Sequence, residues 1–312
     1  MTTGTARVGP SGAAPRFRRR RSRHLFEQAI GWILFACAAV TVLTTVGIVV
    51  ILVTEGLSFF GEISPVDFFT GTRWRPPSEL YGILPLVSGT LLIAVGASIV
   101  SLPLGTLSAI FLSEYASPRV RGVIKPTLEV LAGVPTIVYG YFALTWVTPV
   151  LQHTILPGLG TFNALSAMIV VGVMTLPMVS SIADDSLRAV PSQLREAAYG
   201  VGATRFEVIT RVAFPAALSG IVASYILAVS RAIGETMAVA VAAGATPSLT
   251  ANPLESVQTM TSYIVQVAQG EAPHGTIEFK TIFVVALTLF AMTLLMNMLS
   301  ARVVARFRER YE

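Results

Sequence analysis

The stretch PSQLREAAYGVGATRFEVITRVAFP, residues 191–215, decides the fold, because it places helix signals between two long apolar segments. Pro191 and Ser192 precede LREAAYG and mark a helix start, whereas Gly200 and Gly202 interrupt the helical pattern. The segment ATRFEVITRVAF then resumes that pattern. The stretch therefore predicts a short helix, a glycine turn and a second helix that runs into the next apolar segment.

The composition is that of an integral membrane protein. Hydrophobic residues make up 53% of the 312 residues, charged residues only 12%, and the mean hydropathy is +0.70. Soluble domains carry roughly 25% charged residues, and a helix needs ~20 apolar residues to cross a bilayer. Six apolar segments are long enough, which predicts an all-α polytopic fold with six transmembrane helices at Ala29–Val53, Ile83–Leu112, Leu128–Leu151, Phe162–Ile182, Ala217–Ala243 and Thr281–Val304.

Lysines and arginines predict the orientation of these helices, since short cytoplasmic loops are enriched in them. Eighteen lie in the two tails and in the second and fourth connections, against three in the other connections, namely Arg73, Arg75 and Lys280. We therefore expect the N- and C-termini to be cytoplasmic. The run RFRRRRSR at residues 16–23 fits this bias, so we do not assign it to nucleic-acid binding.

The predicted spans divide the chain into tails, loops and a helical core. A basic cytoplasmic tail at residues 1–28 precedes a first anchoring helix at 29–54, whose apolar run continues past the single cysteine, Cys37, as in a retained span. An external loop follows at 55–81, and its phenylalanines at 59, 60, 68 and 69 are expected either in the membrane interface, which is favoured, or facing an external partner. Residues 82–305 form a five-helix core with a cytoplasmic loop at 184–216, and residues 306–312 form a second cytoplasmic tail.

Two charges lie inside the fifth apolar segment, in the stretch RAIGETMAV at residues 231–239. A charge at the centre of a spanning helix costs about 2.5–3.5 kcal/mol on insertion scales. On a continuous helix Arg231 and Glu235 lie ~40° apart and ~6 Å along the axis, near enough to pair. The pair either locks helices together or serves a charged ligand, and its spacing alone leaves both alternatives open.

Catalytic and cofactor signals are lacking in the sequence. No G-x-x-x-x-G-K-[ST] phosphate loop occurs, and neither Lys125 nor Lys280 lies in a glycine-rich context. The histidines His24, His153 and His274 do not cluster with a nucleophile or at metal-ligand spacing. We therefore expect no enzymatic activity, no metal site and no cofactor in this chain.

The helix pair at residues 191–215 also carries a family motif. Two small alanines beside a carboxylate give a helix face that another protein can approach closely, and the glycine permits the turn. The pattern E-A-A-x3-G-x9-V-x-F-P closely resembles the EAA loop of the permease subunits of bacterial ABC importers, whose usual form ends I-x-L-P. Its residues here are Glu196, Ala197, Ala198, Gly202, Val212, Phe214 and Pro215.

Further segments resemble the phosphate permease (PstC-type) branch of that family. They are RWRPPSELYGILPLVSGTL, LPLGTLSAIFLSEYAS, KPTLEVLAGVPTIVYGYFAL, the EAA stretch and RAIGETMAVAVAAG, which together cover most of residues 73–244. Val134, Thr136 and Ile137 are conservative departures. The first 28 residues and the last external loop show no such resemblance.

The resemblance implies a type I ABC importer permease (MetI-like) core in a bacterial cell membrane. Glu196, Ala197, Ala198 and Gly202 would couple to a cytoplasmic ATPase dimer, which would supply the ATP hydrolysis. It also implies a second homologous permease subunit and an external phosphate-binding protein that delivers inorganic phosphate.

Arg231 would then line the pathway, because a guanidinium binds an oxyanion bidentately and stays charged. Glu235 would neutralise Arg231 when the site is empty. Ser230 and Thr236 would add hydroxyl contacts, although such hydroxyls often bond their own backbone.

Two alternatives remain at this point. Sulfate and molybdate permeases resemble an R-x-L-G-E pattern at this place, so Arg231 and Glu235 do not fix the anion; the full RAIGETMAV string and LAGVPTIVYG favour phosphate. A secondary transporter or a membrane signalling protein is disfavoured because an EAA loop has no use without an ATPase.

Overall fold

The structure is a computed structural model and describes residues 21–273 and 275–307. Its described elements are helices apart from two short strands, β1 (Trp74–Arg75) and β2 (Leu80–Tyr81), which pair antiparallel with Trp74 opposite Tyr81. The predicted all-α fold is confirmed. The chain forms two compact units, residues 1–51 and 52–312, which are described separately.

The first unit contains most of α1 (Arg21–Phe59), whose last residues belong to the second unit. The most apolar 18-residue window within residues 26–59 has a mean hydropathy of 2.6 and none of it is buried within the chain, as suits a helix that faces lipid. The helix begins before the predicted residue 29. Residues 1–20 of the predicted basic tail and residues 308–312 of the second tail lie outside the described residues.

The second unit contains the remaining elements. Its long helices are α3 (Leu84–Ile110), α4 (Pro118–Ala132), α7 (Ala164–Arg188), α10 (Phe214–Ile233) and α13 (Ile277–Phe307). Its short helices are α2 (Pro65–Thr70), the 3-10 turn η1 (Pro76–Ser78), α5 (Thr136–Phe142), α6 (Thr148–Thr154), α8 (Ser192–Gly200), α9 (Arg205–Val208), α11 (Met237–Ala242) and α12 (Met260–Gln266). Among the described residues, four π turns join or end helices: η2 (Phe111–Tyr115), η3 (Ala143–Val147), η4 (Ile209–Ala213) and η5 (Val267–Glu271).

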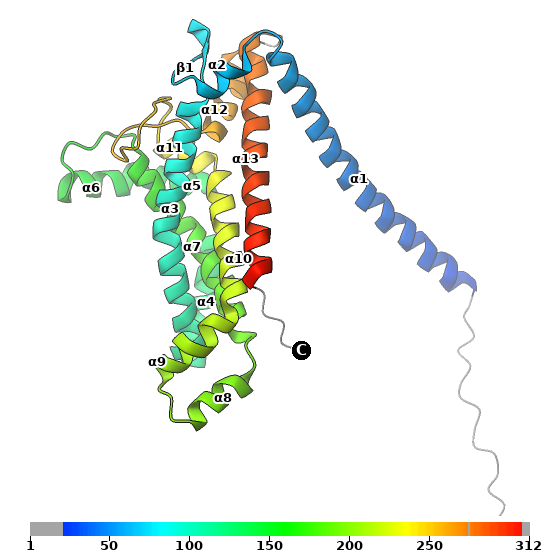
Figure 1. Ribbon diagram of the computed structural model, residues 1–312, viewed down its shortest axis with the longest axis vertical. Coiled ribbons are helices and arrows are strands. Elements are labelled where there is room, and N and C mark those ends of the chain that lie inside the picture. The colour runs from blue at the N-terminus through cyan, green and yellow to red at the C-terminus, as the bar shows by residue number, and fades with distance from the viewer. Residues whose placement is uncertain (1–20, 274, 308–312) are drawn as a thin grey trace, which may run out of the picture. The chain divides into compact units, whose positions relative to one another are not determined.

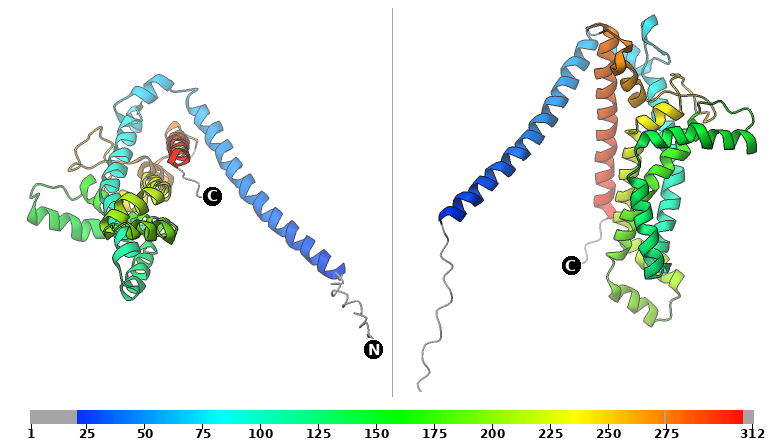
Figure 2. Two further views of the ribbon diagram at one scale, coloured as in Figure 1. Left: turned by 60° about the horizontal axis from the view of Figure 1, so that its bottom comes forward. Right: turned by 180° about the vertical axis from the view of Figure 1, so that it is seen from behind.

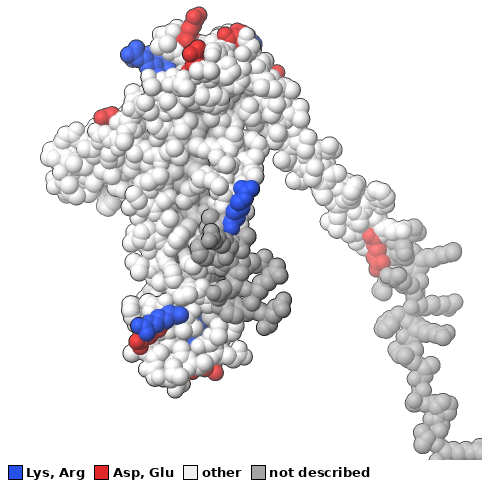
Figure 3. Space-filling model, viewed as in Figure 1, with Lys and Arg blue, Asp and Glu red and all other residues white. Residues whose placement is uncertain are grey.

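Within the second unit, α3, α7 and α10 pack together and α13 lies along α10 (Figures 1 and 2). The helices α8 and α9 lie at one end of this bundle, which we call the α8 end. The strands, α2 and α12 lie at the other end, which we call the hairpin end. On the face shown in Figure 3, most acidic and basic side chains of this unit gather near the two ends, as expected when the middle is in lipid.

The described residues include five helices long and apolar enough to cross a membrane, or six if a bent pair counts as one span. The bent pair differs from the continuous third span predicted at Leu128–Leu151, because α4 and the helix at 136–154 meet at 92°. The bend follows from Pro135, which lacks an amide hydrogen and disfavours a helical conformation at Val134.

Helices α3 and α7 approach closely because glycines line their contact. A Cβ atom on Gly172 would lie 2.7 Å from Val100 Cβ, and one on Gly105 would lie 2.7 Å from Val179 Cβ. A hydrogen bond of 2.6 Å between the hydroxyls of Thr106 and Tyr225 joins α3 to α10. These contacts make α3, α7 and α10 the rigid part that carries the candidate site.

An aromatic cluster fills the hairpin end. Phe59 and Phe68 are fully buried, and their rings pack edge to face at 5.7 Å. The prediction that they lie in the membrane interface is therefore wrong for these two residues, whereas Phe69 is exposed. They are buried because α2 and the β-hairpin cover the end of the bundle, which hydropathy alone does not reveal.

Candidate functional site

The stretch RAIGET lies at a break between two helices. The sequence predicts one span at Ala217–Ala243, but α10 ends at Ile233 and α11 begins at Met237. Gly234 is the C-cap residue of α10 and Thr236 precedes α11. Arg231 therefore occupies the last turn of α10, and Glu235 lies between the helices.

The predicted pairing of Arg231 with Glu235 is wrong. Among the described residues, Arg231 makes no ion pair and no hydrogen bond, and its side chain is exposed. Glu235 is 7% exposed, and its Oε1 accepts a hydrogen bond from the backbone N–H of Ala238 at 3.2 Å. The spacing argument fails because it requires an uninterrupted helix.

The break itself accounts for the two charges. A cation is favoured at a helix C-terminus and a carboxylate at a helix N-terminus. Arg231 lies at the C-terminus of α10, and the Glu235 carboxylate bonds the first turn of α11. Thr261 in α12 donates its hydroxyl to the backbone oxygen of Glu235 at 2.7 Å, so the exposed backbone of the break is partly satisfied. Within the part of the chain that the structure describes, no ion pair occupies the guanidinium of Arg231.

The two neighbouring hydroxyls behave differently. Thr236 donates to the backbone oxygen of Gly234 at 3.2 Å, which leaves it a weak candidate for ligand contact. Ser230 donates to Asn297 Oδ1 at 3.0 Å and so links α10 to α13. Asn297 was missed by the sequence analysis, although a lone amide within the apolar segment at 281–304 was a usable signal.

The α8 end contains the predicted helix pair. Helix α8 covers Ser192–Gly200, and α9 continues through η4 into α10. Glu196 and Ala197 are exposed and Ala198 is half-buried, so the first two are accessible at the surface of α8. Gly202 has φ +87°, a left-handed conformation that suits glycine, and its N–H donates to the Tyr199 oxygen at 2.9 Å.

Helices α8 and α9 are fixed to the π turn at the end of α3 by one ion pair and by further arginine contacts that the sequence analysis missed. Arg195 of α8 donates to Glu114 Oε1 in η2 and to the Leu187 oxygen, each at 2.6 Å. Arg205, the first residue of α9, donates to the Glu114 backbone oxygen, and its guanidinium lies 4.9 Å from the centre of the Tyr115 ring. The Glu114 side chain is 6% exposed. Helices α8 and α9 are therefore both held by contacts with this one buried residue of η2.

A second set of charges joins α4 to α7 at the same end. Arg121 contacts Asp184 at 2.6 Å, and Lys125 contacts Asp184 at 3.5 Å and Asp185 at 2.9 Å. The Asp184 side chain is fully buried. The run FLSEYA before α4 and the run ADD in α7 were visible in the sequence as acidic residues beside apolar segments, but their partners are distant in sequence.

A helical membrane bundle with a projecting helix pair at one end and a charged helix break within it suits a membrane permease, and the similarity to known proteins shows that it is of the ABC importer class. The chain belongs to the family of binding-protein-dependent transport system inner membrane components, whose family model matches residues 101–310.

Several relatives cover nearly the whole chain. The probable ABC transporter permease protein YqgH of Bacillus subtilis is 33% identical over 90% of this chain and 91% of its own length. The phosphate transport system permease protein PstC of Mesorhizobium japonicum is 32% identical over 88% of both chains. PstC 1 of Mycobacterium tuberculosis is 30% identical over 89% of this chain and 93% of its own. The resemblance to PstC-type permeases is thus confirmed.

Solved structures show the same fold at low identity. A bacterial ABC transporter involved in the import of alginate matches with a TM-score of 0.63 and 14% identity, covering 92% of this chain and all of that one. The MetNI methionine ABC transporter matches with a TM-score of 0.54 and 17% identity, covering 73% of this chain and 95% of that one. The predicted type I importer permease (MetI-like) fold is confirmed, and the protein is a multi-pass membrane protein.

Proposed function

We propose that this chain is the membrane permease subunit of an ATP-driven inorganic phosphate importer. It forms half of the translocation pathway, and a second homologous permease subunit forms the other half. The names of the PstC relatives support phosphate as the cargo. An external phosphate-binding protein delivers the anion, and one solved neighbour is an importer in complex with its periplasmic protein.

The observation that carries this proposal is the free guanidinium of Arg231 at the helix break. Glu235 bonds the backbone of α11 and does not occupy Arg231. The planar donors of Arg231 therefore bind the oxyanion as it passes, and the buried carboxylate of Glu235 keeps that binding weak enough for release. Ser230 and Thr236 flank this point, with Ser230 also fixing α10 to α13.

In this proposal the α8 end couples the permease to ATP hydrolysis. Helix α8, with Glu196 and Ala197 exposed and Ala198 half-buried, docks on a cytoplasmic ATPase dimer, and Gly202 permits the turn into α9. The chain itself is not catalytic. The α8 end faces the cytoplasm of a bacterial cell, as do both termini.

Uptake of labelled phosphate into vesicles tests the proposal. The vesicles contain this chain, the second permease subunit and the ATPase, and they are supplied with the binding protein and ATP. We expect phosphate uptake that resists unlabelled sulfate and molybdate and is lost in Arg231→Gln. The matched control is Arg302→Gln, which removes an exposed arginine in the last turns of α13.

Two results would contradict parts of the proposal. Uptake of sulfate or molybdate instead of phosphate would make this a permease for another oxyanion while retaining the architecture. Full uptake by Arg231→Gln would remove Arg231 from the pathway.

A further inference from the structure

Helix α4 carries a charged residue that its contacts do not explain. Glu129 lies near the end of α4, in the first part of the bent pair that counts as one candidate span. Its side chain is exposed, and within the described part of the chain it makes no ion pair and no hydrogen bond. Lys125, one helical turn earlier, contacts Asp184 and Asp185 instead. A charge within a span is costly and usually faces protein or a water-filled cavity, so Glu129 is a candidate for a functional role.

Glu129 lies in the same part of the bundle as Arg231. The hydroxyl of Tyr139, in α5, donates to the backbone oxygen of Leu131 at 2.8 Å, which joins α5 to the end of α4. Tyr139 is also close enough to Arg231 for the two side chains to interact electrostatically. Arg231 is therefore near the end of α4 that carries Glu129, and both charges are unpaired among the described residues.

The two charges lie at different depths along the bundle. Lys125 contacts Asp185 of α7, and Gly220 of α10 packs against the next residue of α7. From that level, Glu129 lies about 6 Å further along α4, and Arg231 lies about 17 Å further along α10. An anion that moves from the hairpin end toward the α8 end therefore meets Arg231 before Glu129.

Arg231 alone does not distinguish one oxyanion from another, because a guanidinium donates to the oxygens of phosphate, sulfate and molybdate alike. A carboxylate, in contrast, only accepts hydrogen bonds. Phosphate keeps at least one proton at neutral pH and can donate it to a carboxylate, whereas sulfate and molybdate carry none and are repelled. A site built to hydrogen-bond a hydroxyl group rejects ligands that lack one.

We propose that Glu129 selects protonated oxyanions by accepting a hydrogen bond from the hydroxyl group of phosphate once the anion has passed Arg231. The inference rests on the proposed function, because it takes the anion to move along this side of the bundle. Glu235 is less suited to this role, since its carboxylate is 7% exposed and accepts from the backbone N–H of Ala238.

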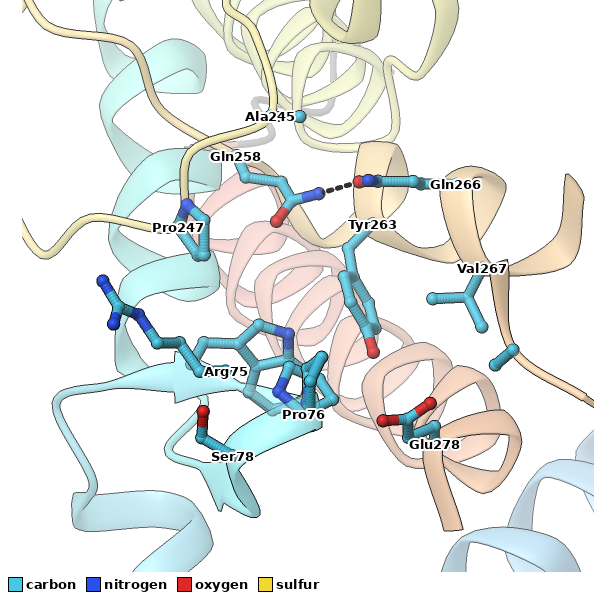
Figure 4. Close-up of a pocket in the computed structure, with 13 residues that line it drawn as sticks. Arg75, Pro76, Ser78, Ala245, Pro247, Gln258, Tyr263, Gln266, Val267 and Glu278 are labelled. Carbon is cyan, nitrogen blue, oxygen red and sulfur yellow. Dashed lines mark hydrogen bonds between the residues drawn. The ribbon is translucent and has the colours of Figure 1, made fainter. Parts of the chain in front are cut away.

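A cavity of about 440 Å³ at the hairpin end is separate from these two charges (Figure 4). Neither Glu129 nor Arg231 lines it. Two of its polar side chains bond each other, since Gln258 Nε2 donates to Gln266 Oε1. Selection by Glu129 therefore does not involve this cavity.

Anion binding to the assembled transporter tests this role without the binding protein, which would impose its own selectivity. The complex of this chain, the second permease subunit and the ATPase is held in nanodiscs, and its melting temperature is measured as sodium phosphate or sodium sulfate is added at matched ionic strength. The stabilisation gives a half-saturating concentration for each anion. We expect the wild type to need less phosphate than sulfate, and Glu129→Gln to lower the sulfate-to-phosphate ratio roughly tenfold, as for one charge-assisted hydrogen bond.

Further variants separate selection from structure. Glu129→Ser also removes the carboxylate and should behave like Glu129→Gln, whereas Glu129→Asp retains a carboxylate and should keep most of the preference for phosphate. Glu79→Gln, the matched control, removes an exposed carboxylate at the hairpin end and should leave the ratio unchanged. Arg231→Gln should weaken the binding of both anions together.

The outcomes separate this inference from the proposed function. If wild-type vesicles do not import phosphate but Glu129→Gln still lowers the ratio, the proposed function is wrong and the role of Glu129 stands. If phosphate uptake is normal and neither Glu129→Gln nor Glu129→Ser changes the ratio, the role of Glu129 is overturned. It is also overturned if both anions stabilise the wild type equally, or if Glu79→Gln lowers the ratio as much as Glu129→Gln does.

Discussion

The buried pair of Arg195 and Glu114 gives the sharpest prediction, through the substitution Arg195→Met. The change keeps a long apolar stem but removes the cation 2.6 Å from Glu114 Oε1 and the bond to the Leu187 oxygen. The two side chains are 19% and 6% exposed. Removing one partner of a buried pair costs about 3–5 kcal/mol, and the partial exposure of Arg195 places this pair near 3 kcal/mol.

An exposed pair of the same length provides the control. Lys280 contacts Glu62 at 2.6 Å, but these side chains are 27% and 51% exposed. Exposed pairs contribute about 0–1 kcal/mol, so Lys280→Met should barely lower the melting temperature of the purified chain in detergent. Arg195→Met should lower it by several degrees.

Transport and ATP hydrolysis should also differ between Arg195→Met and Lys280→Met. Without Arg195, α8 loses its ion pair with the end of α3. If the chain has the proposed function, ATP hydrolysis should then continue with less phosphate imported per ATP. The double variant with Glu114→Gln should be milder than the sum of the single changes, because no carboxylate is then left buried and unpaired. Equal losses of stability and coupling in Arg195→Met and Lys280→Met would refute the reasoning.

Three further changes test other features. Gly202→Ala should cost about 1–2 kcal/mol because its φ of +87° is left-handed, whereas Gly200→Ala, within α8 and with open space, should be neutral or slightly stabilising in the same melting assay. Gly172→Ala should cost about 1–3 kcal/mol through overpacking against Val100, and normal stability of this variant would contradict the close packing of α3 and α7. Since burial raises the pKa of Tyr263 to about 12 from 10.0, the folded chain keeps the phenolic proton longer than the unfolded chain, so stability falls as pH rises through this window. Melting curves of Tyr263→Phe should lose this part of the alkaline destabilisation; an unchanged pH profile would contradict it.

Turn residues and hydropathy predicted the ends of α8 and the positions of the membrane spans, because both depend on residues close together in the sequence. Pro191 and Gly202 mark the two sides of α8, and hydropathy located the spans. The break after α4 was missed because an average over Leu128–Leu151 hides Pro135, although the proline was a usable signal.

Contacts between side chains that are distant in the sequence could not be predicted from it. Glu114 and Arg195 are 81 positions apart, and no spacing rule pairs residues at that distance. Arg231 was found as an unusual charge, but its predicted partner was wrong because the pairing rule holds only within one continuous helix. The C-terminus of α10 favours the cation Arg231 and the N-terminus of α11 favours the carboxylate of Glu235. Both helix ends can be located only once the break at Gly234 is known.

The π turn η4, between α9 and α10, affects how the α8 end is oriented. A π turn holds one residue more than an α turn, and one residue corresponds to about 100° of rotation about the helix axis. A helical wheel drawn continuously from Arg205 to Ile233 therefore assigns one part of this helix to the wrong side. An α-helix with the same number of residues would turn Arg205 by about 100° away from Glu114. The π turn takes up the extra residue, so deleting one residue within Ile209–Ala213 should leave a regular helix that still directs α9 at its anchor.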